Sequence, residues 1–461
     1  MVALATGGYF WLKRSREPAP VSAQSAGAGT RPPTADKPAA PLSPARQLAE
    51  RASALALKKY NSTADDFVAA EGLLKESLAL DQNDAEIWAI SSLFNTAIRT
   101  RGYDNSPTRR EAARSQAERA LKLDPNSTEA LFALGRWQRD HEPDPTVAEK
   151  TFLTVLARAP DHEQALGTLA THYDRTDRFE ESIAMFDRAA RIPAAMPLAR
   201  YGQYLAYFNR WHFDEAERCV RESVAAEPSA NSVTGLAMVL LTARGDAVAA
   251  VRALADLPLA HRSEHRAVWM SANAHLVARD PEGALTALRR FSADFIQDNW
   301  CVGPTAYWTG RAHAQAGRTA AARIAFESGL AVIDEKLKVS SGNSALHVAR
   351  GELLAWLGRT EEALGEARTA TELASERDRL LWFVSPVRIY AALGRPDDAL
   401  PWLERFCARG INRIGWPLTP ALLRIDPLWD KLRGDVRFQA LCVEPLAEEK
   451  KTTGQIRRTR P

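Results

Sequence analysis

The histidines and acidic pairs are the residues of this chain whose spacing is suited to chemistry. His261 and His265 are four residues apart, so a helix would place both imidazoles on one face, where they could bind a metal ion, with His275 further along. The segment lacks the glutamate of an HExxH motif, and the sequence indicates no third ligand. Glu361-Glu362 and Asp397-Asp398 stand where second helices begin, and attraction to the positive helix N-terminus accounts for them. We therefore predict no metal site and no catalytic carboxylate pair.

The sequence also lacks the motifs of nucleotide binding and covalent catalysis. It has no GxxxxGK[ST] phosphate loop, no GxGxxG opening a helix, no GxSxG nucleophile elbow and no protein kinase signature. The four cysteines, Cys219, Cys301, Cys407 and Cys442, lie far apart and form neither a CxxC pair nor a metal-spaced cluster, so we expect buried, apolar thiols. We predict a protein that is not an enzyme and needs no cofactor. An intrinsic hydrolase or metalloenzyme is an alternative that a metal assay on the purified protein would test.

The charge balance limits the class of partner. The chain has 461 residues, with 60 basic and 57 acidic side chains and a net charge of +3. Such a balance gives no general case for binding nucleic acid or a membrane surface. We therefore expect a protein or peptide partner and no nucleic acid.

The stretch from Glu163 to Met196 shows which elements would carry these residues. Apolar residues fall on one helical face at Leu166, Leu169, Ala170 and Tyr173, and on a second at Ser182, Phe186, Ala189 and Ala190. The polar segment 175–178 between them is short, so the two helices must fold back on each other in antiparallel fashion. Because such a pair cannot bury its own apolar face, it needs neighbouring pairs.

The same pattern recurs with a period of about 34 residues, with small residues at repeat positions 8, 20 and 27 and a bulky one at position 24. The preceding repeat has Leu131, Gly135, Ala148, Phe152, Val155 and Pro160, and the following one has Ala216, Val220, Ser223 and Pro228. Three later repeats have Gly310, Gly317, Ala322 and Phe326; Gly351, Gly358 and Ala363; and Tyr390, Gly394 and Ala399. In these three, Gly317, Gly358 and Gly394 suit the left-handed position that closes the first helix.

This pattern resembles the tetratricopeptide repeat (TPR) over roughly Ala45 to Gly410. The resemblance implies an all-α, right-handed superhelical solenoid of about ten helix pairs, spanning 43–410. The repeats around Ala250 and Ala284 lack parts of the signature, and Arg99–Arg109 is an insertion that should lengthen an inter-helix loop. No strand pattern of any length competes with the helices.

The resemblance also implies a concave face lined by the first helix of each repeat. The best-known peptide-binding TPR proteins use a carboxylate clamp with Asn at a set position, where this chain has Ala133, Thr168 and Gly202, so the clamp is missing. The side chains that we expect to line the partner-binding groove are Phe132, Arg136, Arg139, Tyr201, Leu205, Phe208, Asn209, Tyr307, Arg311 and Arg388. Aromatic and Arg side chains make good interface anchors. Packing against neighbouring helices is the alternative for each of them.

The two ends of the chain differ from the repeats. Residues 1–16 are apolar and then basic, with Tyr9, Phe10 and Trp11 before Lys13, as at the exit of a membrane span, but a span needs about 20 apolar residues. We expect either the remainder of a longer membrane anchor or an incidental apolar end. Residues 17–42 are a Pro/Ala/Ser-rich linker, and 449–461 are a basic, disordered tail.

Residues 411–448 should form a C-terminal helical cap, with Leu422, Trp429 and Phe438 covering the last repeat. This ending resembles the close of TPR regions in bacterial membrane-spanning sensor proteins, which would put the solenoid outside the cytoplasm. The Lys/Arg cluster after the apolar segment favours the cytoplasmic side instead. We expect a membrane-associated, extracytoplasmic solenoid, with a cytoplasmic one as the alternative.

We therefore predict a non-catalytic scaffold that captures a protein segment along its concave face. The alternative is the sensing half of a membrane receptor whose kinase, cyclase or DNA-binding output domain is absent from this sequence.

Overall fold

The computed structural model describes residues 41–57, 64–100, 104, 106–298, 301–374, 385–408 and 418–443. They form two compact units, one ending at Ala199 and one beginning at Arg200, which we call the N-terminal and C-terminal units. The predicted anchor (1–16), nearly all of the linker (17–42) and the basic tail (449–461) lie outside the described residues. Within the described ranges, no helix combines the length and the apolar character that crossing a bilayer requires.

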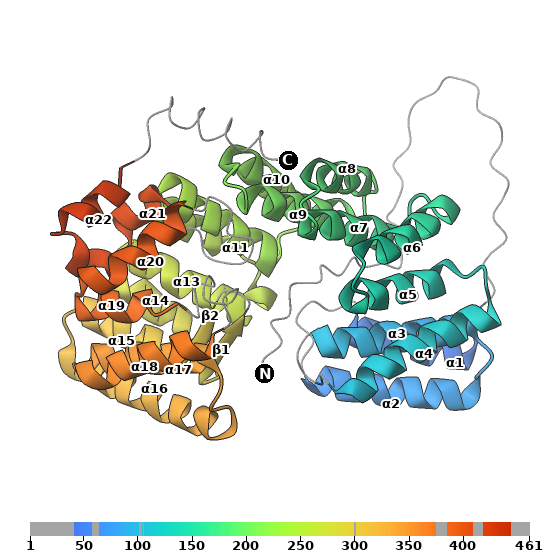
Figure 1. The fold of residues 1–461 in the computed structure, drawn as a ribbon, viewed down its shortest axis with the longest axis horizontal. Coiled ribbons are helices and arrows are strands. Elements are labelled where there is room, and N and C mark those ends of the chain that lie inside the picture. The colour runs from blue at the N-terminus through green and yellow to red at the C-terminus, as the bar shows by residue number, and fades with distance from the viewer. Residues whose placement is uncertain are drawn as a thin grey trace. The chain divides into compact units, whose positions relative to one another are not determined.

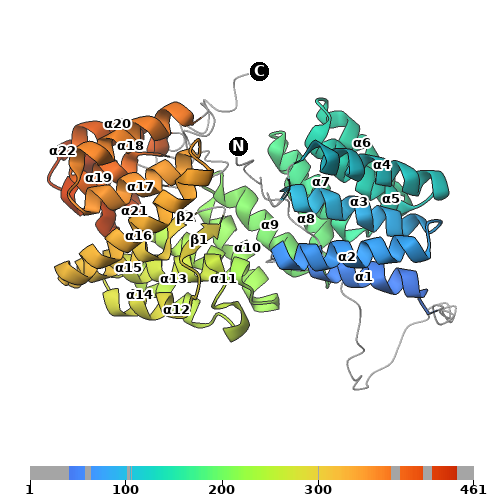
Figure 2. The same ribbon diagram turned by 90° about the horizontal axis from the view of Figure 1, so that it is seen from below.

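The N-terminal unit is a stack of helix pairs (Figures 1 and 2). Its helices are α1 (Pro44–Ala56), α2 (Ala64–Leu80), α3 (Ala85–Thr100), α4 (Pro107–Leu123), α5 (Thr128–His141), α6 (Pro145–Arg158), α7 (Glu163–Arg175) and α8 (Phe179–Ala190). In each pair the two helices pack on each other, and first helices also pack on first helices, as α3 does on α5. The pair predicted for Glu163 to Met196 is confirmed as α7 and α8.

Small and bulky residues interlock at the helix crossings of this unit. A methyl group on Gly135 of α5 would come within 2.8 Å of the Phe152 ring on α6, so the ring occupies the space that the glycine leaves. Phe152 and Phe186 lie in one core with Leu166 and Leu169 of α7, all almost fully buried. Such interlocking reaches the packing density of protein interiors. The predicted repeat register is therefore the register of the core.

The C-terminal unit continues the helix pairs. Its elements are α9 (Met196–Phe208), which begins in the N-terminal unit, α10 (Phe213–Ala226), α11 (Ala230–Val239), the π-turn η1 (Leu240–Arg244), α12 (Ala247–Ala255), η2 (Leu259–His261), α13 (His265–Val277), α14 (Pro281–Leu288), β1 (Phe295–Asp298), β2 (Cys301–Pro304), α15 (Thr305–Gln315), α16 (Thr319–Val339), α17 (Ser344–Trp356), α18 (Thr360–Leu373), α19 (Val387–Leu393), α20 (Pro396–Ala408), α21 (Pro420–Ile425), the 3-10 helix η4 (Pro427–Leu432) and α22 (Val436–Leu441). The predicted all-α solenoid of TPR helix pairs with a C-terminal helical cap is confirmed.

Left-handed backbone conformations mark the turn between the two helices of a pair. They recur at intervals of 34 residues (211 − 177, 245 − 211 and 279 − 245) at Asp177, Trp211, Gly245 and Arg279. The later turns have the predicted glycines, with φ of 74° at Gly317, 75° at Gly358 and 70° at Gly394. Glycine adopts this conformation without steric cost, so Trp211 and Arg279 are exceptions that need another reason.

A two-stranded antiparallel ribbon was not predicted from the sequence. In it β1 pairs with β2, and Phe295 lies opposite Pro304. Strands of four residues are too short to show a clear alternation of apolar and polar residues in the sequence. The ribbon is stabilised by its packing against helices. Ile296 and Cys301 are almost fully buried, and the strands contact α13, α15, α16 and α17.

The C-terminal cap covers more than the last repeat. Its apolar core of Leu422, Trp429 and Phe438 is buried, η4 packs on α19, and α22 packs on α20. In addition, α21 reaches back to η1, where the Thr419 hydroxyl donates a hydrogen bond to the Thr242 carbonyl. The cap thus ties the first complete repeat of this unit to its last (Figure 1).

Candidate partner-binding face

The two histidines of the HxxxH spacing, His261 and His265, do not share a helix in the structure. His261 ends η2 and pairs with Glu264 at 2.6 Å, whereas His265 begins α13 and its Nδ1 accepts a hydrogen bond from the Gln297 amide. His275 pairs with Asp280 at 2.8 Å. Among the described residues, no three His, Cys, Asp or Glu side chains are placed to hold a metal ion.

The predicted groove residues are almost all buried. Those in the N-terminal unit are Phe132 and Arg136, each 2% exposed, and Arg139, whose side chain is 3% exposed. Those in the C-terminal unit are Tyr201, Leu205, Phe208, Tyr307, Arg311 and Arg388, all buried, and Asn209, which is partly exposed. Their role in partner binding therefore depends on what covers them in each unit.

In the C-terminal unit a buried guanidinium joins three elements to the ribbon. Arg266 of α13 lies 3.2 Å from the Asp298 carboxylate of β1. It also donates hydrogen bonds to the hydroxyl of Tyr201 at 2.9 Å and to the side-chain oxygen of Asn231 at 3.0 Å. Tyr201 therefore binds its own chain, and the missed ribbon supplies the counter-ion.

A second buried network involves the predicted residues of the later repeats. Arg388 of α19 lies 2.8 Å from the Glu352 carboxylate of α17, and the Tyr307 hydroxyl donates to the same carboxylate at 3.4 Å. Arg311 of α15 lies 3.9 Å from Asp426, which belongs to the cap. Burial raises the pKa of Glu352 and of Asp426, although Arg388 and Arg311 oppose the shift. The inner side chains of this unit are thus paired with the ribbon, with each other and with the cap.

The N-terminal unit shows a different arrangement, in which basic side chains gather at the C-terminal ends of three first helices. Arg99 ends α3, Arg139 and His141 end α5, and His172 and Arg175 end α7. The negative end of each helix dipole favours a cation there. Because these first helices are adjacent in the stack, their ends form one surface, which we call the cationic face and define by Arg99, Arg136, Arg139, Asp140, His141, His172 and Arg175.

The carboxylate of Asp140 is in direct contact with these cations. Asp140 accepts hydrogen bonds of 2.9 and 3.2 Å from Arg139 and lies 3.5 Å from the guanidinium of Arg175. Burial alone would raise the pKa of Asp140, but Arg139, Arg136 and Arg175 hold the pKa well below its usual range. The potential at this position is therefore strongly positive.

The pKa values of the basic groups are lowered as well, because burial and a positive potential both disfavour the charged form of a base. Burial, together with the charges of Arg139 and Arg175, lowers the pKa of Arg136 to about 9. Burial and neighbouring arginines likewise lower the pKa of His172 and of His141. His141 also contacts Arg99, whose pKa is lowered by burial and by Arg110. Mutual repulsion between cations is therefore a property of this face.

The cationic face has a buried floor and an accessible rim. Arg136, Arg139 and His172 are shielded from solvent, whereas the side chain of Arg175 is 43% exposed and Arg99 is partly exposed. A ligand can therefore reach the rim, while the floor contributes its charge from below.

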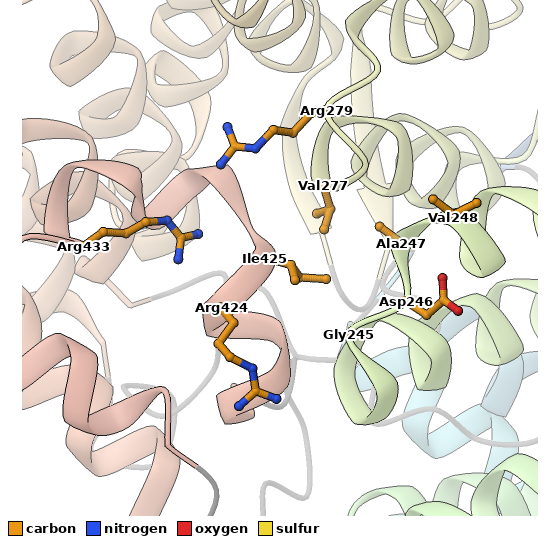
Figure 3. A pocket seen from close by; sticks show the side chains of 9 residues that line it. All are labelled: Gly245, Asp246, Ala247, Val248, Val277, Arg279, Arg424, Ile425 and Arg433. Carbon is orange, nitrogen blue, oxygen red and sulfur yellow. The ribbon is translucent and has the colours of Figure 1, made fainter.

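The C-terminal unit has a pocket of about 550 Å3 beside the cap (Figure 3). Its lining is Gly245, Asp246, Ala247, Val248, Val277, Arg279, Arg424, Ile425 and Arg433. The arginines are engaged with their own chain: Arg279 and Arg433 bond to Asp430, and Arg424 donates to the Cys442 carbonyl at 2.7 Å. The carboxylate of Asp430 thus offsets part of the positive charge of this pocket.

Comparison with known proteins identifies the repeats. The family model of the tetratricopeptide repeat matches residues 144–197 and 269–336, one stretch in each unit. In these two stretches the chain carries tetratricopeptide repeats. Its similarity to membrane-anchored sensor proteins is not tested by these matches and stays a prediction.

Individual relatives match parts of the chain. A segment of 97 residues, 21% of this chain, is 38% identical to cellulose synthase operon protein C of Xanthomonas axonopodis pv. citri (strain 306) and spans 6% of that protein. Among solved structures, PilF of Pseudomonas aeruginosa is 16% identical with a TM-score of 0.35, covering 46% of this chain and 92% of its own. The human IFIT1 dimer with PPP-AAAA is 14% identical with a TM-score of 0.41, covering 72% of this chain and 73% of its own.

Proposed function

We propose that this protein is a non-catalytic scaffold that captures a segment of a partner protein on the cationic face of its N-terminal unit. The observation that carries the proposal is the gathering of Arg99, Arg136, Arg139 and Arg175 at the ends of three adjacent first helices around one carboxylate. Partly exposed arginines above a buried, charged floor are well suited to anchor an interface.

The proposal narrows the groove predicted from the sequence. Tyr201, Tyr307, Arg311 and Arg388 bond to α13, α17 and the cap of their own unit. We therefore assign partner binding to Arg136 and Arg139 with the rim residues. We assign an internal role to these four residues of the C-terminal unit and to Phe132, whose ring packs in the core against Phe152.

Site-directed photocrosslinking tests this assignment. Glu142 caps the C-terminus of α5 beside His141 and is exposed, so a photoreactive amino acid there would sample the cationic face. Glu327 on α16 is a matched control, with a side chain that is 52% exposed. In cells expressing the full chain, we expect a protein adduct from position 142 and not from 327. Adducts from 327 alone, or equal adducts from both, would overturn the assignment.

We also propose that the scaffold is held near a membrane by its first residues. The apolar segment ending at Leu12 and followed by Lys13 supports this, as does the order of aromatic and basic residues. Cell fractionation with the native chain tests it, because complete recovery in the soluble fraction would contradict the attachment. The same experiment with protease protection would show on which side the scaffold lies, which separates the extracytoplasmic from the cytoplasmic alternative.

A further inference from the structure

We infer that the ligand of the cationic face is an extended acidic segment of a partner protein, with its Asp or Glu residues about three apart. The inference rests on the proposed function and adds the chemistry of the partner. It follows from the charge of the face, from the behaviour of its own carboxylate and from the spacing of its helices.

The charge comes from cations on neighbouring helices. Arg99 is on α3, Arg136 and Arg139 are on α5, and Arg175 is on α7, with Asp140 as the carboxylate among them. Buried charge is screened little by solvent, so the attraction for an anion is stronger here than at an open surface.

The contacts of Asp140 show how a carboxylate is bound at the cationic face. Its two oxygens accept a forked pair of hydrogen bonds from Arg139, and Arg175 approaches to 3.5 Å from the rim. The positive potential that stabilises this carboxylate extends to a second one placed on the rim between Arg175 and Arg99. A neutral segment gains nothing from that potential, so the face discriminates in favour of acidic partners.

The spacing of the helices sets the spacing of the acidic residues. Packed helices lie about 8–10 Å apart, so the cations of α3, α5 and α7 follow one another at about that interval. A chain in the polyproline II conformation advances about 3.1 Å per residue with three residues per turn, so every third side chain lies on the same side and falls opposite the next helix. Three acidic residues at this spacing, one for each helix, occupy a segment of about seven residues.

The aromatic rings at this face favour a peptide over a single-stranded nucleic acid. Single strands bind by stacking their bases on open aromatic faces. Here Trp137 is stacked on His141, with ring centroids 5.2 Å apart, and Arg114 lies 5.3 Å from its ring. The Tyr173 ring is covered by Arg178 at 4.2 Å. The rings are therefore already occupied.

The test measures binding of a labelled Gly/Ser peptide of about nine residues with Glu at every third position to the full chain, by fluorescence anisotropy. The same peptide with Gln in place of Glu is the first control, and a labelled single-stranded oligonucleotide is the second. We expect the Glu peptide to bind at least about tenfold more tightly than the Gln peptide, a difference of the size that charge complementarity gives. Its affinity should fall as salt is raised from about 0.01 to about 0.15 M, since the Debye length shrinks from about 30 to about 8 Å.

Charge variants locate the binding. Arg175→Glu changes a side chain that is 43% exposed, and Arg99→Gln removes a second rim charge. Arg323→Glu on α16, at 73% exposure, is the matched control for a general change of charge. We expect each rim variant to weaken the Glu peptide about tenfold and the control to leave it unchanged. Circular dichroism melts identify a variant that has lost its fold, in which case the other rim variant decides.

Three results would overturn the inference: equal binding of the Glu and Gln peptides, tighter binding of the oligonucleotide, or equal weakening by the Arg323→Glu control. If crosslinking at position 142 still captures a protein while the Glu peptide fails to bind, the acidic chemistry is wrong and the scaffold function stands. If both experiments fail, the proposed function falls together with the inference.

Discussion

The guanidinium of Arg279 donates two hydrogen bonds, each 2.8 Å long, to the carboxylate of Asp430, which lies 151 residues later in the chain. Arg279 stands in the left-handed turn between α13 and α14, with φ of 58°, where later repeats have glycine. Its side chain thus connects a turn of an early repeat of the C-terminal unit to the cap. This bond gives a reason for an arginine at a position that the backbone would leave to glycine.

The first prediction separates the stabilisation by this ion pair from the strain of the left-handed backbone at Arg279. Arg279→Ala loses the ion pair and keeps the left-handed strain, and since the pair is about half exposed its loss should cost about 0.2–1 kcal/mol. Arg279→Gly loses the same pair but relieves a strain of about 1–2 kcal/mol, so this variant should be the more stable of the two. Urea unfolding of the full chain checks the order. An alanine variant as stable as the glycine variant would show that the turn carries no strain.

The second prediction compares two glycines of one helix pair. Gly358 has φ of 75° and open space around an added Cβ, whereas Gly365 lies within α18. Gly358→Ala should cost about 1–2 kcal/mol through its left-handed backbone. Gly365→Ala should stabilise the protein by about 0.5–1 kcal/mol, because alanine loses less backbone entropy in a helix. Changes of the same sign at both sites in thermal unfolding would contradict this explanation.

The third prediction concerns the buried pair of Glu352 and Arg388. Glu352→Ala leaves the guanidinium of Arg388 without this carboxylate in a buried site and should cost roughly 3–5 kcal/mol. The double variant Glu352→Leu/Arg388→Met removes both charges together and should recover most of that loss. Denaturant unfolding of the single and double variants provides the comparison. If the double variant were as unstable as the single one, packing rather than charge would explain the effect.

The fourth prediction is a pH dependence carried by His172. Burial, with the charges of Arg139 and Arg175 and against that of Glu149, lowers the pKa of His172 below its ordinary value of 6.5. The unfolded chain therefore binds more protons than the native chain below about pH 6.5, so stability is complete above that pH and is lost as the pH falls. His172→Gln should reduce this loss, as measured by urea unfolding at neutral and mildly acidic pH.

His347 of the C-terminal unit serves as the control for the direction of this pH dependence. Its hydrogen bond of 2.6 Å to Glu366 raises the pKa of His347. Its contribution is therefore fully present below about pH 6.5 and is lost as the pH rises through the raised value. His347→Gln should weaken the protein at mildly acidic pH, opposite to the effect of His172→Gln. Equal effects of both variants would contradict the two environments described above.

The sequence by itself determined the repeated helix pairs. The alternation of small and bulky residues, as at Gly135 and Phe152, and the glycines that close first helices are local signals. Each acts within one helix pair or between adjacent pairs, so a period of about 34 residues makes them readable. The groove positions of Arg136 and Arg139 were readable for the same reason, since both arginines lie on the first helix of one repeat.

Tertiary structure decided which of the predicted groove residues are paired within their own unit. The ribbon that supplies Asp298 to Arg266 and the cap that supplies Asp426 to Arg311 act across long separations in the chain. No local pattern encodes such contacts, because their free energy depends on burial and on a counter-ion that only the folded chain provides. The contact between Arg175 and Asp140 likewise depends on the packing of adjacent repeats, and it forms part of the cationic face.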